Sequence, residues 1–443
     1  MKIIIIGGTA AGMSAAAKAN RTDASLDITV YEKSQYISFG ACGLPYFAGG
    51  FFNDADMMLA RTVEEMAQLG VQVKTLHEVT AVDEKSKTIT VKNVQTGEEF
   101  ISSYDKLMIA TGAVGKSPAM PGMDLGNIFA LRSMRDGLAI NSLLLDGNVK
   151  DIVVIGSGPI GLEAVHAVRH LKKNVTLIVK QNRILDRYFS SEMTNLLEVE
   201  LIGNSVNLRL GEEALEIVQT GGAKMVVTNK GSYKADLIIH SIGAVPNTAF
   251  LQNTGIAMDK GTILVDRYGR TNVEDIYAAG DCATIYNVVK GGHSYSPLAT
   301  VANKLGRIVG ENLAGGNAYF MGSLDSMCIQ VMDMEAGRTG LTEAEAKSMG
   351  LDYATAFVHD KNQAGYYPGQ EDIFIKLIYD AKSKVILGGE IVGKKGAVLR
   401  VNTLAACIYS KMTTYELAQL DLCYSPPFSK AWDALNIVAG LVK

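Results

Sequence analysis

One cysteine of this 443-residue sequence lies in a segment suited to chemistry. Cys42 is the centre of a Gly- and Pro-rich turn, Ser38-Phe39-Gly40-Ala41-Cys42-Gly43-Leu44-Pro45-Tyr46. A thiolate is the reactive form of cysteine, and a helix N-terminus or nearby donors favour it. Placed at the start of a helix, Cys42 would act as a redox or nucleophilic thiolate. The alternative is a small buried hydrophobic residue.

The other four cysteines are scattered, and the odd total of five does not form a disulfide framework. Cys282, Cys328 and Cys407 are expected to be core thiols. Cys423 adjoins Tyr424, so a redox role for it stays open. A reducing compartment, the cytoplasm, is therefore expected.

Two glycine-rich turns are typical of dinucleotide sites. The turn Gly7–Gly12 separates an apolar strand, Lys2–Gly7, from a helix, Met13–Asn20. The turn Gly156–Gly161 separates the strand Asp151–Ile155 from the helix Leu162–Leu171. Free N–H groups and the helix dipole at such a turn bind a pyrophosphate. Ordinary tight turns are the alternative, but two turns in the same context predict two nucleotide sites.

The residues at the strand ends predict which nucleotide each turn holds. Glu32 ends the strand Asp27–Tyr31, where it would bind a ribose hydroxyl pair. The corresponding residue after the second turn is Val179, followed by Lys180 and Arg183. The missing carboxylate and the two cations favour NADPH or dual use, unless the cations are solvated surface charges. Asp281 ends the strand-like segment 271–281, where it would bind a flavin polyol or cap a helix.

Composition limits the function classes. Hydrophobic residues make up 48% and charged residues 20%, and the net charge is −4 with no basic block. A disordered chain is excluded, and nothing supports a nucleic-acid or membrane partner. No apolar run approaches the roughly 18 residues of a membrane span, and no signal peptide or metal site is expected.

The predicted fold is α/β: two Rossmann-like dinucleotide-binding domains followed by a C-terminal α+β interface domain. We expect one dinucleotide-binding domain at 1–111 and 247–322, a second at 112–246, and a separate interface domain at 323–443. From about residue 323 the chain has no glycine fingerprint. This arrangement amounts to three domains, as the length suggests.

The whole chain resembles the FAD-dependent pyridine nucleotide–disulfide oxidoreductases. The resemblance is carried by the two glycine turns and by Ala110-Thr111-Gly112, Gly243…Pro246-Asn247 and Thr271–Asp281. Cys42 lacks the second cysteine of a C-x4-C pair, so the segment resembles the single-cysteine branch. That branch contains coenzyme A-disulfide reductases, NADH oxidases and peroxidases, and persulfide or polysulfide reductases.

Three features resemble the coenzyme A type in particular. Ala10 stands where oxidases and peroxidases usually carry a histidine. The stretch Cys42-Gly43-Leu44-Pro45-Tyr46 is closer to the reductase pattern. Tyr366 and Tyr424 lie in motifs like the paired tyrosines that, in those enzymes, reach the partner subunit's active site.

The resemblance implies FAD, NADPH or NADH, and coenzyme A as substrate or mixed disulfide, in a homodimer. The expected catalytic residues are Cys42, Tyr366 and Tyr424. The expected FAD residues are Gly7, Thr9, Ala10, Ala11, Gly12, Glu32, Lys33, Val79, Ala110, Thr111, Gly112, Asp281 and Ala299. The expected NAD(P)H residues are Gly156, Gly158, Pro159, Ile160, Gly161, Glu163, Val179, Lys180, Arg183 and Gly243. The expected coenzyme A residues are Ser14, Lys18, Arg21, Ser38 and Asn303.

The implied activity is an NAD(P)H-dependent coenzyme A-disulfide reductase. Three alternatives remain open: persulfide or polysulfide reduction, reduction of oxygen or peroxide through a Cys42 sulfenic acid, and a flavin-containing sensor with an inert Cys42. Lys18 and Arg21 could also be ordinary solvated helix charges.

Overall fold

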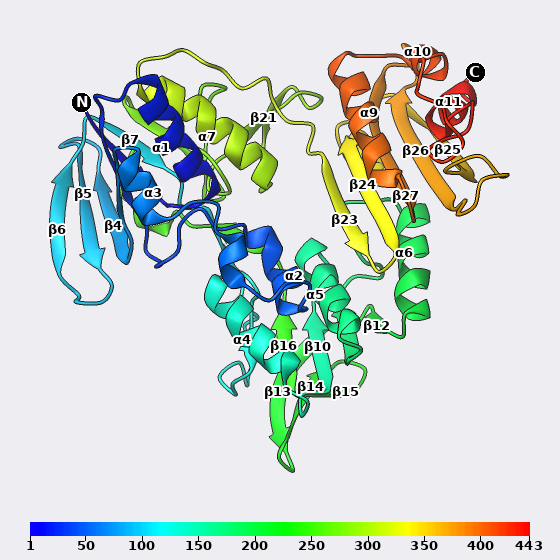
Figure 1. The fold of residues 1–443 in the computed structure, drawn as a ribbon, viewed down its shortest axis with the longest axis horizontal. Helices are drawn as coiled ribbons and strands as arrows, with labels where there is room; N and C mark the ends of the chain where they lie inside the picture. The colour runs from blue at the N-terminus through cyan, green and yellow to red at the C-terminus, as the bar shows by residue number, and fades with distance from the viewer.

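The computed structural model describes residues 1–443, which form three bodies (Figure 1). The first body contains a parallel five-stranded sheet with the order β20-β7-β1-β2-β3. Its strands are Ile276–Ala278, Lys106–Ile109, Lys2–Ile6, Asp27–Tyr31 and Val71–Lys74. Four consecutive isoleucines fill β1, and burial on both faces is typical of a central parallel strand.

Two helices pack together on this sheet, α1 (Ala10–Thr22) and α7 (Ala299–Leu313). Gly306 and Gly310 allow the close approach. A Cβ added at either glycine would lie 2.9 Å from the Cα of Ala11 or Ala15. Small residues on both helices therefore fix the position of the α1 N-terminus.

The second body repeats the design with the sheet order β12-β11-β10-β16-β9, all neighbours parallel. The strands are Asn207–Leu210, Asn174–Val179, Asp151–Ile155, Leu237–His240 and Ile128–Phe129. The helices are α4 (Met134–Leu145), α5 (Pro159–His170) and α6 (Ser191–Gly203). The chain passes between the two bodies twice, through β8 (Ala113–Gly115) and β17 (Ala244–Pro246), which pair antiparallel.

The third body is an antiparallel sheet with the order β23-β24-β27-β26-β25, covered by helices. Its strands are Met327–Val331, Met334–Gly340, Ile386–Gly393, Asp372–Asp380 and Tyr353–Lys361. Its helices are α8 (Glu343–Ser348), α9 (Ala397–Tyr409), α10 (Thr414–Ala418) and α11 (Ala434–Gly440). The two Rossmann-like units and the C-terminal α+β unit confirm the predicted fold class.

The chain also contains several smaller elements, of which only the helix after Cys42 is expected from the sequence. Two three-stranded antiparallel sheets are inserted, one in each Rossmann-like unit: β4 (His77–Asp83), β5 (Thr88–Asn93) and β6 (Glu99–Ser103), then β13 (Ala214–Thr220), β14 (Ala223–Thr228) and β15 (Ser232–Ala235). Short helices α2 (Leu44–Ala48) and α3 (Val63–Gln68) and the strand pairs β18 (Met258–Asp259) with β19 (Thr262–Ile263) and β21 (Ile285–Asn287) with β22 (Gly292–Ser294) complete the chain. No helix combines the length and apolar character that crossing a membrane requires.

Candidate active site

The first glycine turn is shaped to hold a pyrophosphate. Gly7 has φ +108°, and a Cβ there would overlap the carbonyl of Ala110, so only glycine fits. The N–H groups of Ala10, Ala11 and Gly12 have no intramolecular acceptor, because they open α1. These free donors at the start of a 13-residue helix fit a dinucleotide such as FAD.

Glu32 lies directly after β2 and is nearly buried. Its carboxylate accepts hydrogen bonds from the N–H groups of Gly8 and Ser34, each at 2.8 Å. These two bonds fix the side chain beside the turn. Lone pairs of the same carboxylate remain for a ribose hydroxyl pair.

The predicted polyol residue, Asp281, forms an ion pair that the sequence did not reveal. Its Oδ2 lies 3.1 Å from Nη2 of Arg132, whose Nε donates to the carbonyl of Ala113. Burial and nearby carboxylates raise the pKa of Cys42, and Arg132 opposes that rise with a smaller effect. Sequence reasoning missed Arg132 because no motif marks it and the contact spans two domains.

The remaining expected FAD residues surround the same sheet edge. Ala110 and Val79 are buried, Thr111 and Gly112 follow β7, Thr9 precedes α1, Lys33 is exposed after β2, and Ala299 opens α7. Thr111 donates its hydroxyl to the carbonyl of Asn247 at 2.7 Å, which ties the two halves of this unit together.

The second glycine turn has the same geometry with more open space. Gly156 has φ +105°, and a Cβ at Gly161 would overlap the carbonyl of Gly156. A Cβ on Gly158 would meet nothing within 4 Å, and Gly243 is equally open. Pro159 has no N–H, while those of Ile160 and Gly161 have no intramolecular acceptor. The turn therefore fits a second dinucleotide.

The two cations expected near the second ribose, Lys180 and Arg183, already have polar partners within the chain. Lys180 pairs with Glu213 at 2.6 Å but is well exposed. Arg183 donates to the carbonyls of Asp186 (2.8 Å) and Phe189, so much of its guanidinium shapes the loop. Val179 is fully buried at the end of β11.

Cys42 is accessible, but its thiolate is not favoured in the chain alone. It lies in a single 3₁₀ turn, Ala41–Gly43, before the five-residue α2. Partial desolvation, and then the carboxylates of Glu163 and Asp281, raise the pKa of the Cys42 thiol. Cys42 thus precedes a helix as expected, but so short a helix has a weak dipole, and in the chain alone burial and two carboxylates oppose the thiolate.

Glu163 reaches this site from α5, which packs against α2. A Cβ on Gly49, at the end of α2, would come 2.8 Å from the Cβ of Ala167. Burial raises the pKa of Glu163 to about 7. The same carboxylate raises the pKa of Tyr46, although desolvation is the larger cause.

The two expected catalytic tyrosines meet each other on the interface domain. Tyr366 lies in the loop between β25 and β26, Tyr424 follows α10, and their hydroxyl oxygens are 2.7 Å apart. Tyr366 is 77% exposed and Tyr424 is 48% exposed. The hydrogen bond to Tyr366 raises the pKa of Tyr424. Neither tyrosine is among the groups that shift the pKa of Cys42 in its own chain.

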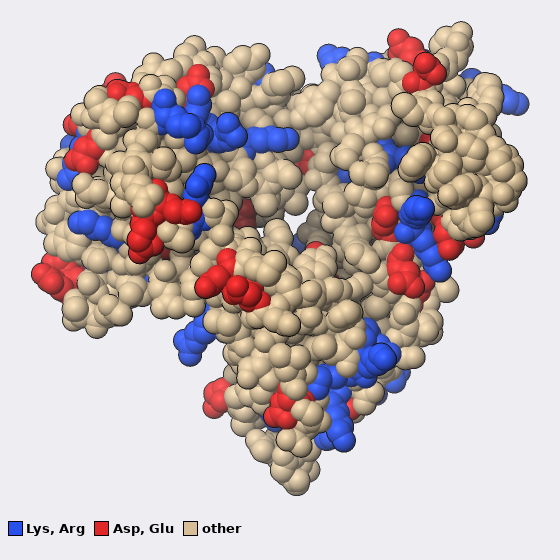
Figure 2. Space-filling model, in the orientation of Figure 1, with Lys and Arg blue, Asp and Glu red and all other residues tan.

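Three of the expected coenzyme A residues, Ser14, Lys18 and Asn303, lie at a seam between α1 and α7. The hydroxyl of Ser14 donates to Asn303 Oδ1 at 2.7 Å, and Lys18 pairs with Glu311 at 3.0 Å. Arg21 is in the last turn of α1, and Ser38 has φ +51° at the entrance to the Cys42 segment. Lysine and arginine side chains gather over α1 and α7 on the face in Figure 2.

The other cysteines divide between core and surface. Cys282 and Cys407 are buried, whereas Cys328 and Cys423 are exposed. The expectation that Cys328 is a core thiol is therefore wrong. It lies on the first strand of the interface sheet, where alternate residues face outward.

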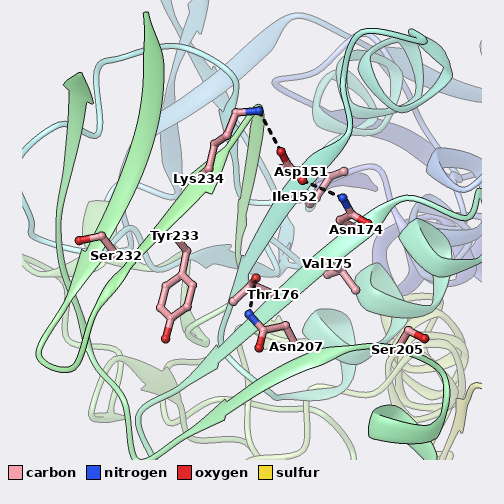
Figure 3. A pocket seen from close by; sticks show the side chains of 10 residues that line it. All are labelled: Asp151, Ile152, Asn174, Val175, Thr176, Ser205, Asn207, Ser232, Tyr233 and Lys234. Atoms are coloured by element: carbon pink, nitrogen blue, oxygen red, sulfur yellow. Dashed lines mark hydrogen bonds and ion pairs between the residues drawn. The ribbon is translucent and has the colours of Figure 1, made fainter. Parts of the chain in front are cut away.

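A polar cavity of about 410 Å³ lies away from all these residues. Figure 3 shows its lining at the amino ends of β10, β11 and β12 and along β15, with Lys234 bonded to Asp151. Nucleotides bind at the carboxyl ends of such strands, so this cavity is not the nucleotide site.

Comparison with known proteins identifies the family. Residues 1–306 match the family model described as pyridine nucleotide-disulphide oxidoreductase, and residues 327–435 match the dimerisation domain of that family. The chain belongs to the pyridine nucleotide-disulphide oxidoreductases, as the sequence motifs predicted.

Curated relatives within the family differ in the activity they are named for. An NAD(P)H coenzyme A polysulfide/persulfide reductase of Pyrococcus horikoshii is 36% identical, over 100% of this chain and 98% of the relative. A coenzyme A disulfide reductase of Staphylococcus haemolyticus is 32% identical, over 99% of this chain and 98% of the relative.

A solved structure shows the same overall fold. It is an engineered water-forming NADPH oxidase, a mutant of the Lactobacillus brevis NADH oxidase, bound to NADPH. It has a TM-score of 0.95 and 32% identity, over 100% of this chain and 98% of that chain. These matches establish the family and the oxidoreductase class, and the relatives differ in the molecule that accepts the electrons.

Proposed function

We propose that this protein is a flavin-dependent NAD(P)H:coenzyme A-disulfide reductase. The observation that carries the proposal is that Cys42 is accessible and unpaired. A disulfide at Cys42 must therefore take its second sulfur from the substrate. The coenzyme A disulfide reductase from Staphylococcus supports this choice of substrate, as does the exposed tyrosine pair.

The residues divide the work as follows. Bound FAD would carry an electron pair from NAD(P)H to sulfur, held by the first glycine turn, Glu32 and Asp281. The Cys42 thiolate attacks coenzyme A disulfide, a Cys42–coenzyme A disulfide bond forms, and one coenzyme A thiolate leaves. Tyr424, hydrogen-bonded to Tyr366, donates a proton to that thiolate. The electron pair from NAD(P)H then reduces the mixed disulfide to the Cys42 thiolate and a second coenzyme A thiolate, which is also protonated. Of the two protons used, one comes from the hydride and one from solvent. Per cycle, NAD(P)H, one proton and one disulfide give NAD(P)⁺ and two thiols.

Several expected residues have separate parts in this proposal. Ser14, Lys18, Arg21, Ser38 and Asn303 would bind the coenzyme A phosphates and adenosine along the α1–α7 seam. The absence of an acid at Val179 and the exposed Lys180 support use of NADPH. In the engineered NADPH oxidase, the changes include replacement of an aspartate by alanine and of the next residue by arginine, the same chemical pattern.

We further propose a cytoplasmic homodimer, in which Tyr366 and Tyr424 serve the partner's Cys42. The match to a dimerisation domain supports the dimer, and five free cysteines support a reducing compartment.

The test combines mass spectrometry and rapid kinetics. We expect the protein, isolated without reductant, to carry a coenzyme A adduct on Cys42. The Cys42→Ser variant should still bind FAD and accept a hydride, yet release no thiol from coenzyme A disulfide. Turnover of the disulfide by this variant would refute the proposal, and so would a protein that folds without taking up flavin.

A second candidate is reduction of persulfide or polysulfide with the same residues. The Pyrococcus relative favours it, because its name includes both coenzyme A and persulfide. Release of sulfide from coenzyme A persulfide, faster than thiol release from coenzyme A disulfide, would select this candidate.

A further inference from the structure

Three charged side chains lie in one row across the interface sheet. Arg338 on β24 is in register with Glu390 on β27, which is in register with Lys376 on β26. Each of the three residues is at most 5% exposed. Burying an ion costs free energy unless the ion is well paired, so the partners of these three side chains indicate their role.

The partners lie on another domain, at the start of α6. Glu390 Oε2 accepts hydrogen bonds from the N–H and the hydroxyl of Ser190, both at 2.8 Å. Lys376 Nζ donates to Glu192 Oε1 at 3.0 Å, and also to Glu343 Oε2 at 2.6 Å within the interface domain. Figure 1 shows α6 directly beside the interface sheet.

Ser190 is the N-cap residue of α6, but its hydroxyl makes no cap hydrogen bond to that helix. A serine at this position usually caps its own helix. Here the hydroxyl instead binds the interface domain through Glu390.

The segment before α6 is the loop that follows β11, which contains Lys180 and Arg183. This loop is joined to α6 by the Ile184 N–H, which donates to Glu198 Oε1 at 3.0 Å. Arg183 draws together the carbonyls of Asp186 and Phe189 within the loop. Fixing Ser190 and Glu192 therefore fixes the loop beside the second nucleotide site.

We propose that Glu390 and Lys376 are positioning residues for the pyridine nucleotide. Through Ser190 and Glu192, the interface domain holds the ribose loop of the NAD(P)H domain in its binding conformation. The inference rests on the proposed use of NAD(P)H, and it extends that function by making nucleotide affinity depend on the dimerisation domain. A loop that is only partly in its binding conformation weakens affinity by that fraction.

Two variants test the contacts separately. Ser190→Ala removes the hydroxyl that donates to Glu390. The Glu390 carboxylate still accepts a hydrogen bond from the backbone N–H of residue 190, so it keeps a partner. Lys376→Met removes the contact to Glu192. For each, we expect the Kd of 2′,5′-ADP or ADP-ribose and the KM of NAD(P)H to rise about tenfold. We expect kcat, FAD content and the KM of the disulfide to stay within about twofold.

Hydrogen exchange of the full flavoprotein supplies a readout that does not depend on turnover. Residues 181–192 should exchange faster in both variants, with the Gly7–Gly12 turn unchanged. Lys290→Met is the matched control, because Lys290 bonds to Asp325 and Glu345 and to nothing in the NAD(P)H domain. This control should leave nucleotide affinity and loop exchange as in the wild type.

If folded Ser190→Ala and Lys376→Met bind 2′,5′-ADP and ADP-ribose as tightly as the wild type does, the inference is overturned. An equal loss of affinity in Lys290→Met would also overturn it. If Lys376→Met does not fold, Ser190→Ala decides alone. Failure of NAD(P)H to reduce the wild-type flavin would refute the proposed function instead. The binding of 2′,5′-ADP or ADP-ribose and the hydrogen exchange of residues 181–192 would still decide whether Glu390 and Lys376 position the loop.

Discussion

At the scale of single residues, burial and then the Glu163 carboxylate oppose formation of the Cys42 thiolate, because both raise the pKa of the thiol. Glu163 raises the pKa of Cys42, and burial raises the pKa of Glu163 itself to about 7. Above that pH the carboxylate is charged and opposes a second negative charge on the thiol. Ionisation of Glu163 thus moves ionisation of Cys42 to still higher pH.

Replacing Glu163 by glutamine should therefore lower the pKa of Cys42. Alkylation of Cys42 by iodoacetamide, followed by peptide mass spectrometry in flavin-free protein, should show its midpoint at lower pH in the variant. Glu335→Gln is the control, because Glu335 acts on the charge of Cys328 and not on that of Cys42. A midpoint that stays in place, or moves upward, contradicts the assignment of Glu163 as a neighbour of the thiol.

A second prediction at the scale of residues concerns Val179 and the choice between NADPH and NADH. The backbone around Val179 resembles that around Glu32. Glu32 accepts from the N–H of Gly8, and the matching N–H, that of Ser157, has no acceptor. The carboxylate of Val179→Glu would find this donor, would bind ribose hydroxyls and would repel a 2′-phosphate.

We expect Val179→Glu to lower the ratio of NADPH to NADH kcat/KM by at least about tenfold. Steady-state kinetics with both nucleotides measures it, and Val179→Gln, which has no charge, should shift the ratio far less. An unchanged ratio in a folded Val179→Glu protein would show that the ribose binds elsewhere.

At the scale of elements, the sequence predicts two strands to the residue, but the strand expected over Thr271–Asp281 forms only at Ile276–Ala278. Asp27–Tyr31 and Asp151–Ile155 have the expected bounds, because each is a buried run between polar residues. The helices after both glycine turns begin earlier than expected, at Ala10 and Pro159. Glycine, alanine and proline were assigned to the turn, yet Pro fits the first helical position and Ala favours helix throughout.

Some site features depend on contacts between distant segments, so no local pattern could reveal them. Arg132 and Asp281 are joined only by folding, as are Glu390 and Ser190. The raised pKa of Cys42 also depends on folding, because burial is its largest cause and Glu163, from another domain, is the next. The meeting of the Tyr366 and Tyr424 hydroxyls was suggested by a family resemblance, not by spacing.

The contact of α1 with α7 gives an element-scale prediction. In Gly306→Ala the new Cβ would lie 2.9 Å from Ala11 Cα, so the helices must separate. Because α1 carries the first glycine turn, FAD binding should weaken, and stability should fall by about 1–3 kcal/mol, as in other overpacked cores.

Flavin fluorescence titration and thermal unfolding measure the two effects. Gly147→Ala is the control, since a Cβ there meets nothing within 4 Å. Equal FAD affinity in Gly306→Ala and wild type would show that the seam does not position the turn.

At the scale of the whole molecule, one chain separates the groups that the proposed reaction needs together. Cys42 is influenced by Glu163, Asp281 and Arg132 of its own chain, while Tyr366 and Tyr424 project from the interface domain with exposed rings. A second copy is the natural source of the missing tyrosines, because a symmetric dimer exchanges equivalent contacts. Each active site would then consist of one chain's cysteine and the other chain's tyrosine.

Mixed dimers of Cys42→Ser and Tyr424→Phe chains distinguish this arrangement from action within one chain. If Tyr424 acts across the interface, one site of the mixed dimer carries both lesions and the other is intact. Such dimers, purified with two different tags, should keep about half of the wild-type disulfide reductase activity. The Tyr424→Phe homodimer should lose about 10²–10⁴-fold, as expected for a positioned acid, with flavin reduction near normal. If instead Tyr424 acts on its own Cys42, each site of the mixed dimer has one lesion and most activity disappears. That result would refute exchange of tyrosines between subunits while leaving Cys42 as the redox thiol.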